Sequence, residues 1–171
     1  MKIFFIDGYN VLHTWPELKN EKNYSFAAAR EKLINIMHNY AACNESKVVI
    51  VFDGYKVQGN IEGKEVINKY LTVVFTKDGE TADSYIEREV SSLGRRYEVY
   101  VVTSDWLEQQ TIFQRGAVRV SSIEFHNDVI EVQKDIKKIE KEKIVPKNHL
   151  QDNINSDVLE KLEQIRRSNL K

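Results

Sequence analysis

Short apolar runs recur along the first part of the chain, and segments with helical periodicity separate them. Each run is rich in β-branched and aromatic residues, which is typical of strands buried on both faces of a parallel sheet. The four clearest runs are Ile3–Ile6, Val48–Phe52, Leu71–Phe75 and Val99–Val102. A shorter run at Ala117–Val120 would form a fifth strand. The pattern predicts a mainly parallel sheet of four to five strands.

Helices are predicted between these runs, where apolar residues repeat every three or four positions. One helix begins after Ser25, a favoured N-cap residue, and another follows Thr81 and continues to Leu93. Residues 105–115 are expected to form a third, shorter helix. Alternation of strands and helices is typical of a three-layer α/β/α domain, which we expect over residues 1–120.

Two segments of this region lack such periodicity and are expected to be loops. Asp53–Asn68 combines three glycines with several charged side chains, which predicts a mobile loop. The residues that follow the first strand, including His13, are also expected to lie in a loop.

The last fifty residues have a different pattern. Ser121 and Glu124 are spaced as in a capping box, and the apolar positions after them predict a long helix to about Lys143. A polar linker, residues 147–155, precedes a final helix over Ser156–Arg167. We expect residues 121–171 to form a helical arm that packs on the core as part of the same domain. A surface that docks a partner is the alternative.

The composition narrows the class of protein. The 171 residues include 25 Lys and Arg against 26 Asp and Glu, a net charge of −1, so any nucleic-acid contact must come from a local patch. The single cysteine, Cys43, excludes an internal disulfide and every multi-cysteine zinc motif. No apolar run approaches the roughly 18 residues of a membrane span. We therefore expect a cytoplasmic protein with no membrane partner.

Acidic side chains follow each of the four clear strands. Asp7 follows the first and Asp53 the second, Glu80 and Asp83 come after the third, and Asp105 follows the fourth. The carboxyl ends of parallel strands share one edge, so these acids converge and repel one another unless a cation is present. Mg²⁺ and Mn²⁺ prefer oxygen ligands and keep waters for substrate phosphates. The sequence therefore predicts a metal-dependent phosphoryl-transfer or phosphodiester-cleaving site.

Several other residues near this edge are candidates for substrate contacts. Lys56, Lys64 and Lys77 are placed to approach a phosphate backbone, although solubilising surface lysines are the alternative. Trp15 flanks the proposed cleft and would stack a base, an interaction worth about 1–3 kcal/mol, with packing in the core or at the rim as the alternative. Ser104 would hydrogen-bond a carboxylate or a water at the site.

Four motifs in this order resemble the NYN domains of the PIN-like nuclease superfamily, and more narrowly the bacterial YacP-type proteins. The motifs are Ile6–Val11, Phe52–Asp53, Phe75–Asp83 and Val102–Asp105, and the resemblance covers nearly the whole chain. It implies a PIN-like fold and a small metal-dependent endoribonuclease that cleaves messenger RNA on the translating ribosome. By motif, Asp7, Asp83 and Asp105 match the metal-binding acids, Asn10 matches the polar residue that orients the site, and Glu80 and Asp53 match flanking acids.

The expected function is therefore RNA hydrolysis with Mg²⁺ or Mn²⁺ and no small-molecule cofactor. Asp7, Asn10, Asp83 and Asp105 would be the catalytic residues. The alternative is a non-catalytic RNA- or ribosome-binding module on the same fold, which would have lost one or more of the acids. These residues do not distinguish RNA from DNA as the substrate.

Overall fold

The computed structural model describes residues 1–54, 63–93, 96–104, 116–143 and 161. Within them the sheet has six strands in the order β3-β4-β2-β1-β5-β6. β3 pairs with β4 in antiparallel fashion, and every other pair is parallel. The strands are β1 (Lys2–Asp7), β2 (Lys47–Phe52), β3 (Gly63–Val66), β4 (Leu71–Phe75), β5 (Glu98–Val102) and β6 (Val118–Val120). The predicted mainly parallel sheet is confirmed, and it has one strand more than expected.

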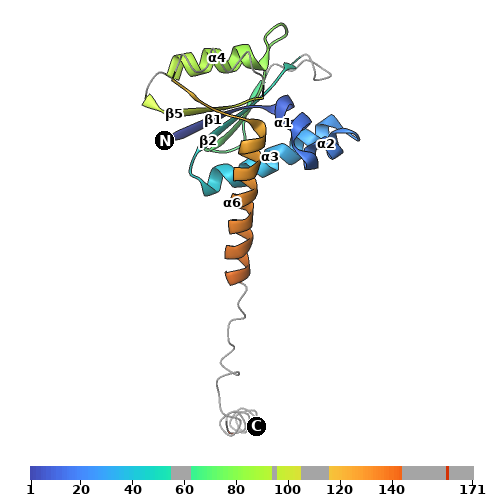
Figure 1. Ribbon diagram of the computed structural model, residues 1–171, viewed down its shortest axis with the longest axis vertical. Helices are drawn as coiled ribbons and strands as arrows, with labels where there is room; N and C mark the ends of the chain where they lie inside the picture. Colours follow the sequence, from blue (N-terminus) through green and yellow to red (C-terminus); the bar gives the residue numbers. More distant parts are fainter. Residues whose placement is uncertain (55–62, 94–95, 105–115, 144–160, 162–171) are drawn as a thin grey trace, which may run out of the picture. The chain divides into compact units, whose positions relative to one another are not determined.

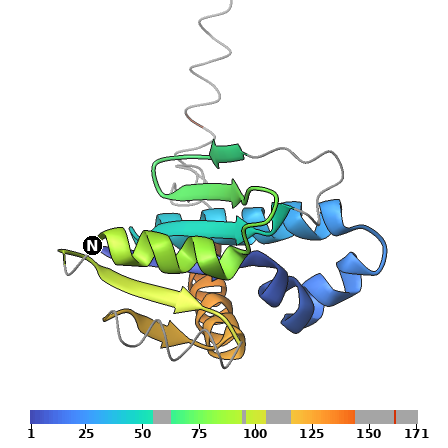
Figure 2. The ribbon, with the colours of Figure 1, turned by 90° about the horizontal axis from the view of Figure 1, so that it is seen from above.

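Helices cover both faces of this sheet, which confirms the three-layer α/β/α class. α4 lies on one face, and α3 lies on the other with α1 and α2 beside it (Figures 1 and 2). The helices of the described residues are α1 (Gly8–Thr14), α2 (Pro16–Lys22), α3 (Phe26–Cys43), α4 (Ala82–Leu93) and α6 (Ser122–Lys143). None of these helices is long and apolar enough to cross a membrane.

Alternating side chains of the central strand supply two hydrophobic cores. Phe4 and Ile6 of β1 join the core beneath α1, α2 and α3, whereas Ile3 and Phe5 join the core beneath α4. The α3-side core also contains Phe125, from the first turns of α6. Burial on both faces explains why β1 is a continuous apolar run.

The chain divides into two compact units, Met1–Gln133 and Lys134–Lys171. The first unit contains the whole sheet and the beginning of α6. In the second unit the structure describes the end of α6 and Lys161. Packing of the remaining C-terminal residues on the core stays a prediction.

The segment after β1 is helical, so the expected loop there is wrong. Asp7 caps α1 because its Oδ1 accepts the N–H of Asn10 at 3.0 Å. Pro16 opens α2 at a first-turn position, where its missing N–H costs nothing. His13 consequently lies in α1, with Nδ1 2.8 Å from Nζ of Lys22.

Part of the other expected loop, Asp53–Asn68, is a strand instead, because Gly63–Val66 forms β3 by pairing with β4. The start of the long C-terminal helix is as predicted. Ser121 N and Oγ donate to Glu124 Oε2 at 2.9 and 2.6 Å, and Glu124 N donates to Ser121 Oγ at 3.2 Å, which completes the capping box. The hydrogen bond from the Ser121 hydroxyl, together with that from its backbone, lowers the pKa of the Glu124 carboxyl.

Some predicted features lie outside the described residues. They are Lys56, the helix over 105–115 with Asp105, the linker over 147–155, and the final helix over 156–167 apart from residue 161.

Candidate active site at the carboxyl edge of the sheet

The sheet register brings the predicted strand ends together. Asp7, at the end of β1, pairs with Val51, so Asp53 follows two residues later on the neighbouring strand. On the other side of β1, Ile6 pairs with Val102, which places the segment 103–104 next to Asp7. The candidate residues that follow β1, β2 and β5 therefore meet at one edge.

The topology also predicts a ligand crevice at this edge. From β1 the chain passes to β2 and β4 on one side, and then returns through α4 to β5 on the other side. β1 is thus flanked by strands reached in opposite directions, which makes it a topological switch point, where open α/β sheets bind their ligands. Asp7 lies at the carboxyl end of this strand.

Two glycines let the strand ends approach closely. A Cβ atom on Gly8 would lie 2.3 Å from Cε1 of Phe52, and one on Gly54 would lie 1.9 Å from the carbonyl oxygen of Thr76. Gly54 N also donates to Oγ1 of Thr76 at 3.0 Å. The glycine after each of the first two acids is therefore required by packing at the edge that carries them.

Asn10 contributes an amide oxygen that lacks a donor. Its Oδ1 is buried and has no hydrogen-bond partner among the described residues. A buried acceptor left in this state costs about 1–3 kcal/mol, and such atoms commonly contact an ion or an ordered water. This oxygen lies one helical turn after Asp7, on the helix that Asp7 caps.

Asp53 connects the end of β2 to the start of α4. Its Oδ1 accepts the N–H of Ala82 at 2.6 Å, so a residue 29 positions away caps this helix. Thr81 adds a local cap, because its Oγ1 accepts the N–H of Ser84 at 3.2 Å. Asp83 follows Ala82 in the first turn of α4, where the helix dipole favours an acid.

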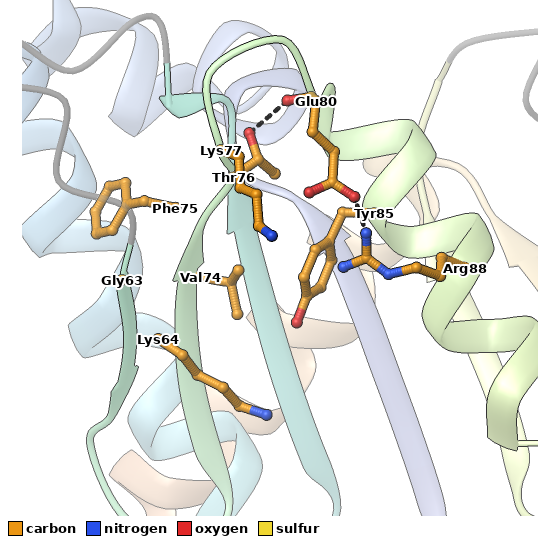
Figure 3. A pocket seen from close by; sticks show the side chains of 9 residues that line it. All are labelled: Gly63, Lys64, Val74, Phe75, Thr76, Lys77, Glu80, Tyr85 and Arg88. Carbon is orange, nitrogen blue, oxygen red and sulfur yellow. Dashed lines mark hydrogen bonds and ion pairs between the residues drawn. The ribbon is translucent and has the colours of Figure 1, made fainter.

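Glu80 and two of the predicted substrate-contacting lysines, Lys64 and Lys77, line a pocket of about 340 Å³ (Figure 3). The Glu80 carboxylate forms an ion pair with the Arg88 guanidinium. The Glu80 backbone oxygen accepts a hydrogen bond of 2.6 Å from Oγ1 of Thr76. Lys64 and Lys77 both line the pocket, as expected of residues near the same edge.

Sequence reasoning missed two residues of this pocket, Tyr85 and Arg88. Their helical spacing was the available signal, because Tyr85 and Arg88 are three residues apart and therefore share one face of α4. Without the position of α4 over the sheet, both look like ordinary surface residues of an amphipathic helix.

Trp15 does not contact the candidate site, so the predicted base stacking is wrong. Its side chain is only 1% exposed and belongs to the α3-side core. Nε1 donates to the backbone oxygen of Ser122 at 2.9 Å, and the ring lies 4.7 Å from that of His126. The alternative of core packing is therefore correct, since Trp15 joins the α1–α2 junction to the start of α6.

The donors at this edge are hard oxygen ligands. Asp7, Asp53 and Asp83 provide carboxylates, and Asn10 provides its buried amide oxygen. Within the described ranges, no group of three or more His, Cys, Asp or Glu side chains is placed to hold a metal ion on its own. Asp105, the remaining predicted ligand, falls outside those ranges. The chemistry of the set fits Mg²⁺ or Mn²⁺ rather than a soft metal.

Comparison with known proteins gives the same family throughout. Residues 4–167 match the family described as the YacP-like NYN domain. The chain is 38% identical to a YacP protein of Bacillus subtilis (strain 168), described as uncharacterized, and the match covers 99% of each chain. The crystal structure of Rae1 (YacP) from Bacillus subtilis is similar, with a TM-score of 0.75, 36% identity, and coverage of 99% of this chain and 97% of that one. A mutant of Rae1 gives a TM-score of 0.73 at 34% identity, covering 85% and 84%.

Proposed function

The chain belongs to the family of YacP-like NYN domains, and from this premise we propose that it is a metal-dependent endoribonuclease that hydrolyses phosphodiester bonds in RNA. The observation that carries the proposal is the buried Oδ1 of Asn10, which has no donor and lies one turn from Asp7 at the switch point of the sheet. An oxygen in that position is suited to an ion or to a held water.

The ion would be Mg²⁺ or Mn²⁺, held by Asp7, Asp83 and Asp105 with Asp53 and Glu80 as flanking acids. When bound, such an ion supplies positive charge to the scissile phosphate and makes an attacking water more acidic. Asn10 would orient the site through its amide oxygen. Ser104, exposed beyond the end of β5, would hydrogen-bond the substrate or a water at this edge.

The RNA substrate would be messenger RNA on the translating ribosome, as the family resemblance implies. The net charge of −1 supports dependence on a larger partner, because it leaves the isolated chain with little general attraction for phosphate. A large partner that presents the RNA strand would remove the need for a broad basic surface.

An end-labelled RNA cleavage assay with Mn²⁺ or Mg²⁺, run with and without translating ribosomes, tests this function. Asp7→Asn and Asp83→Asn should each lower cleavage at least about 100-fold, which corresponds to about 3 kcal/mol of transition-state stabilisation. Asp128→Asn is the matched control, because this exposed carboxylate lies on α6. Its cleavage rate should stay within about twofold of the unaltered protein.

Each outcome of this assay distinguishes one part of the proposal. Metal-dependent cutting of free RNA would support the nuclease and contradict the need for the ribosome. Cleavage that survives both substitutions would show that the site is elsewhere. If no RNA is cut under any condition, the chain is better described as a non-catalytic binding module.

A further inference from the structure

The pocket beside the acidic edge exists because α4 covers only part of its face of the sheet. α4 packs over β1 and β2, and β4 and β3 extend beyond it toward the sheet edge (Figure 2). The pocket lies in this step, between the outer strands and the side of α4. Thr76, Lys77 and Glu80 line its end nearest the carboxyl edge, so the pocket adjoins the candidate active site.

The charged side chains of the antiparallel strand β3 lie on opposite faces of the sheet. Lys64 pairs with Val74, whose side chain belongs to the α4-side core, so Lys64 lies on the pocket side. Glu65 pairs with Val73, which belongs to the opposite core, so Glu65 lies on the other side. The pocket therefore receives the lysine of β3 and not its neighbouring glutamate.

Three cations from three elements surround the pocket. Lys64 comes from β3, Lys77 from the turn after β4 and Arg88 from α4, and Glu80 is the acid among the lining residues. Three positive charges and one negative charge give a local charge of +2 on a chain whose net charge is −1. Figure 3 shows the Lys64 and Arg88 side chains reaching in from opposite sides.

Arg88 is held in place on the wall of this pocket. Its guanidinium lies 4.8 Å from the centre of the Tyr85 ring and is ion-paired with Glu80, and its Nε lies 3.8 Å from Oε1 of Glu89, although the side chain is 54% exposed. A guanidinium has five N–H donors, so donors remain for a ligand beside those that face Glu80 and Glu89. The Tyr85 hydroxyl is protonated at neutral pH, as in any tyrosine, and burial raises its pKa further above the ordinary value.

We propose that this pocket is a subsite that binds a backbone phosphate of single-stranded RNA next to the cleavage site, with Lys64, Lys77 and Arg88 as its ligands. The inference rests on the proposed nuclease function and adds the path of the substrate. The cations are spread over three elements, as expected for a strand that passes through, and Thr76, Lys77 and Glu80 line the pocket at the carboxyl end of β4, on the edge that carries the acids. Arginine and lysine are the usual ligands of phosphate groups.

RNA binding without metal tests this subsite separately from cleavage. The probe is a fluorescein-labelled single-stranded RNA of about ten nucleotides, titrated by anisotropy in EDTA with the full chain. The double variant Lys64→Gln/Arg88→Gln should weaken binding at least about tenfold, because two of three phosphate ligands are removed. Lys19→Gln/Lys47→Gln is the matched control, since both lysines are exposed and lie away from the pocket, and it should stay within about twofold.

A second arm measures cleavage of messenger RNA with Mn²⁺ in the presence of translating ribosomes, as the proposed function requires. The pocket variant should raise KM about tenfold and leave kcat within about twofold, because its residues bind the strand and do not meet the reacting atoms. Unchanged RNA affinity in the pocket variant would overturn the subsite, even if Asp7 and Asp83 prove essential. Loss of RNA affinity in the pocket variant, with no cleavage by any protein either with or without ribosomes, would keep the subsite and reject the nuclease. If an acidic decapeptide binds as tightly and with the same dependence on Lys64 and Arg88, the pocket instead recognises acidic protein segments.

Discussion

At the scale of single residues, Trp15 shows how an aromatic side chain near a site can be structural. Replacing it with alanine removes a fully buried ring and its hydrogen bond to Ser122, so Trp15→Ala should lower the free energy of unfolding by about 3–5 kcal/mol. Urea unfolding measures this, with Tyr24→Ala as the control, since Tyr24 is 91% exposed and should cost less than about 0.5 kcal/mol. An unchanged stability together with lost RNA binding would reinstate base stacking.

The same scale shows which site residues a sequence can reveal. Asp7 and Asp53 were predictable because each directly follows a buried apolar strand, and strand ends in a parallel sheet share an edge. The second role of Asp53, as the cap of α4, depends on a contact across 29 residues that no local pattern encodes. Arg88 was equally hidden, because its place in the wall of the pocket depends on the part of the sheet that α4 leaves open.

At the scale of elements, Asp53 joins the end of β2 to the start of α4, and two substitutions distinguish this structural role from a role in cleavage. Asp53→Ala removes the acceptor for the Ala82 N–H and should cost about 1–2 kcal/mol of stability. Asp53→Asn keeps an acceptor of similar capping strength, so its stability should stay within about 0.5 kcal/mol of the unaltered protein. We expect both variants to lose RNA cleavage if the carboxylate flanks the metal. RNA cleavage and thermal unfolding are measured on both variants. If the asparagine variant is fully active, Asp53 caps α4 and its charge has no part in cleavage.

Among elements, those with strong periodicity were predicted and those that depend on context were not. The helices α3, α4 and α6, which have apolar repeats, and the central parallel strands follow the pattern of the sequence. β3 carries no apolar alternation, and its four residues form a strand because β4 offers an unpaired edge. α1 and α2 are seven residues each, and their signals are caps, Asp7 and Pro16, rather than a repeated apolar stripe.

At the scale of the whole molecule, the net charge of −1 limits the affinity of the isolated chain for RNA. If the three cations of the pocket are the main phosphate ligands, log affinity should fall with log salt concentration with a slope of about −2, which is 0.7 per ligand for single strands. Anisotropy titrations between about 50 and 200 mM salt measure the slope. A slope steeper than about −4 would show that a much wider basic surface binds the RNA.

The position of β1 at the centre of the sheet also determines when this molecule can fold. β1 comes before both of its neighbours in the sequence, since β2 begins at Lys47 and β5 at Glu98. During synthesis about forty further residues must be added before β2 is available to pair with β1, and about ninety before β5 is available. Contacts so distant along the chain form slowly, and an unpaired central strand is prone to aggregate. The strand that positions Asp7 is thus also the one that most needs protection while the chain is being made.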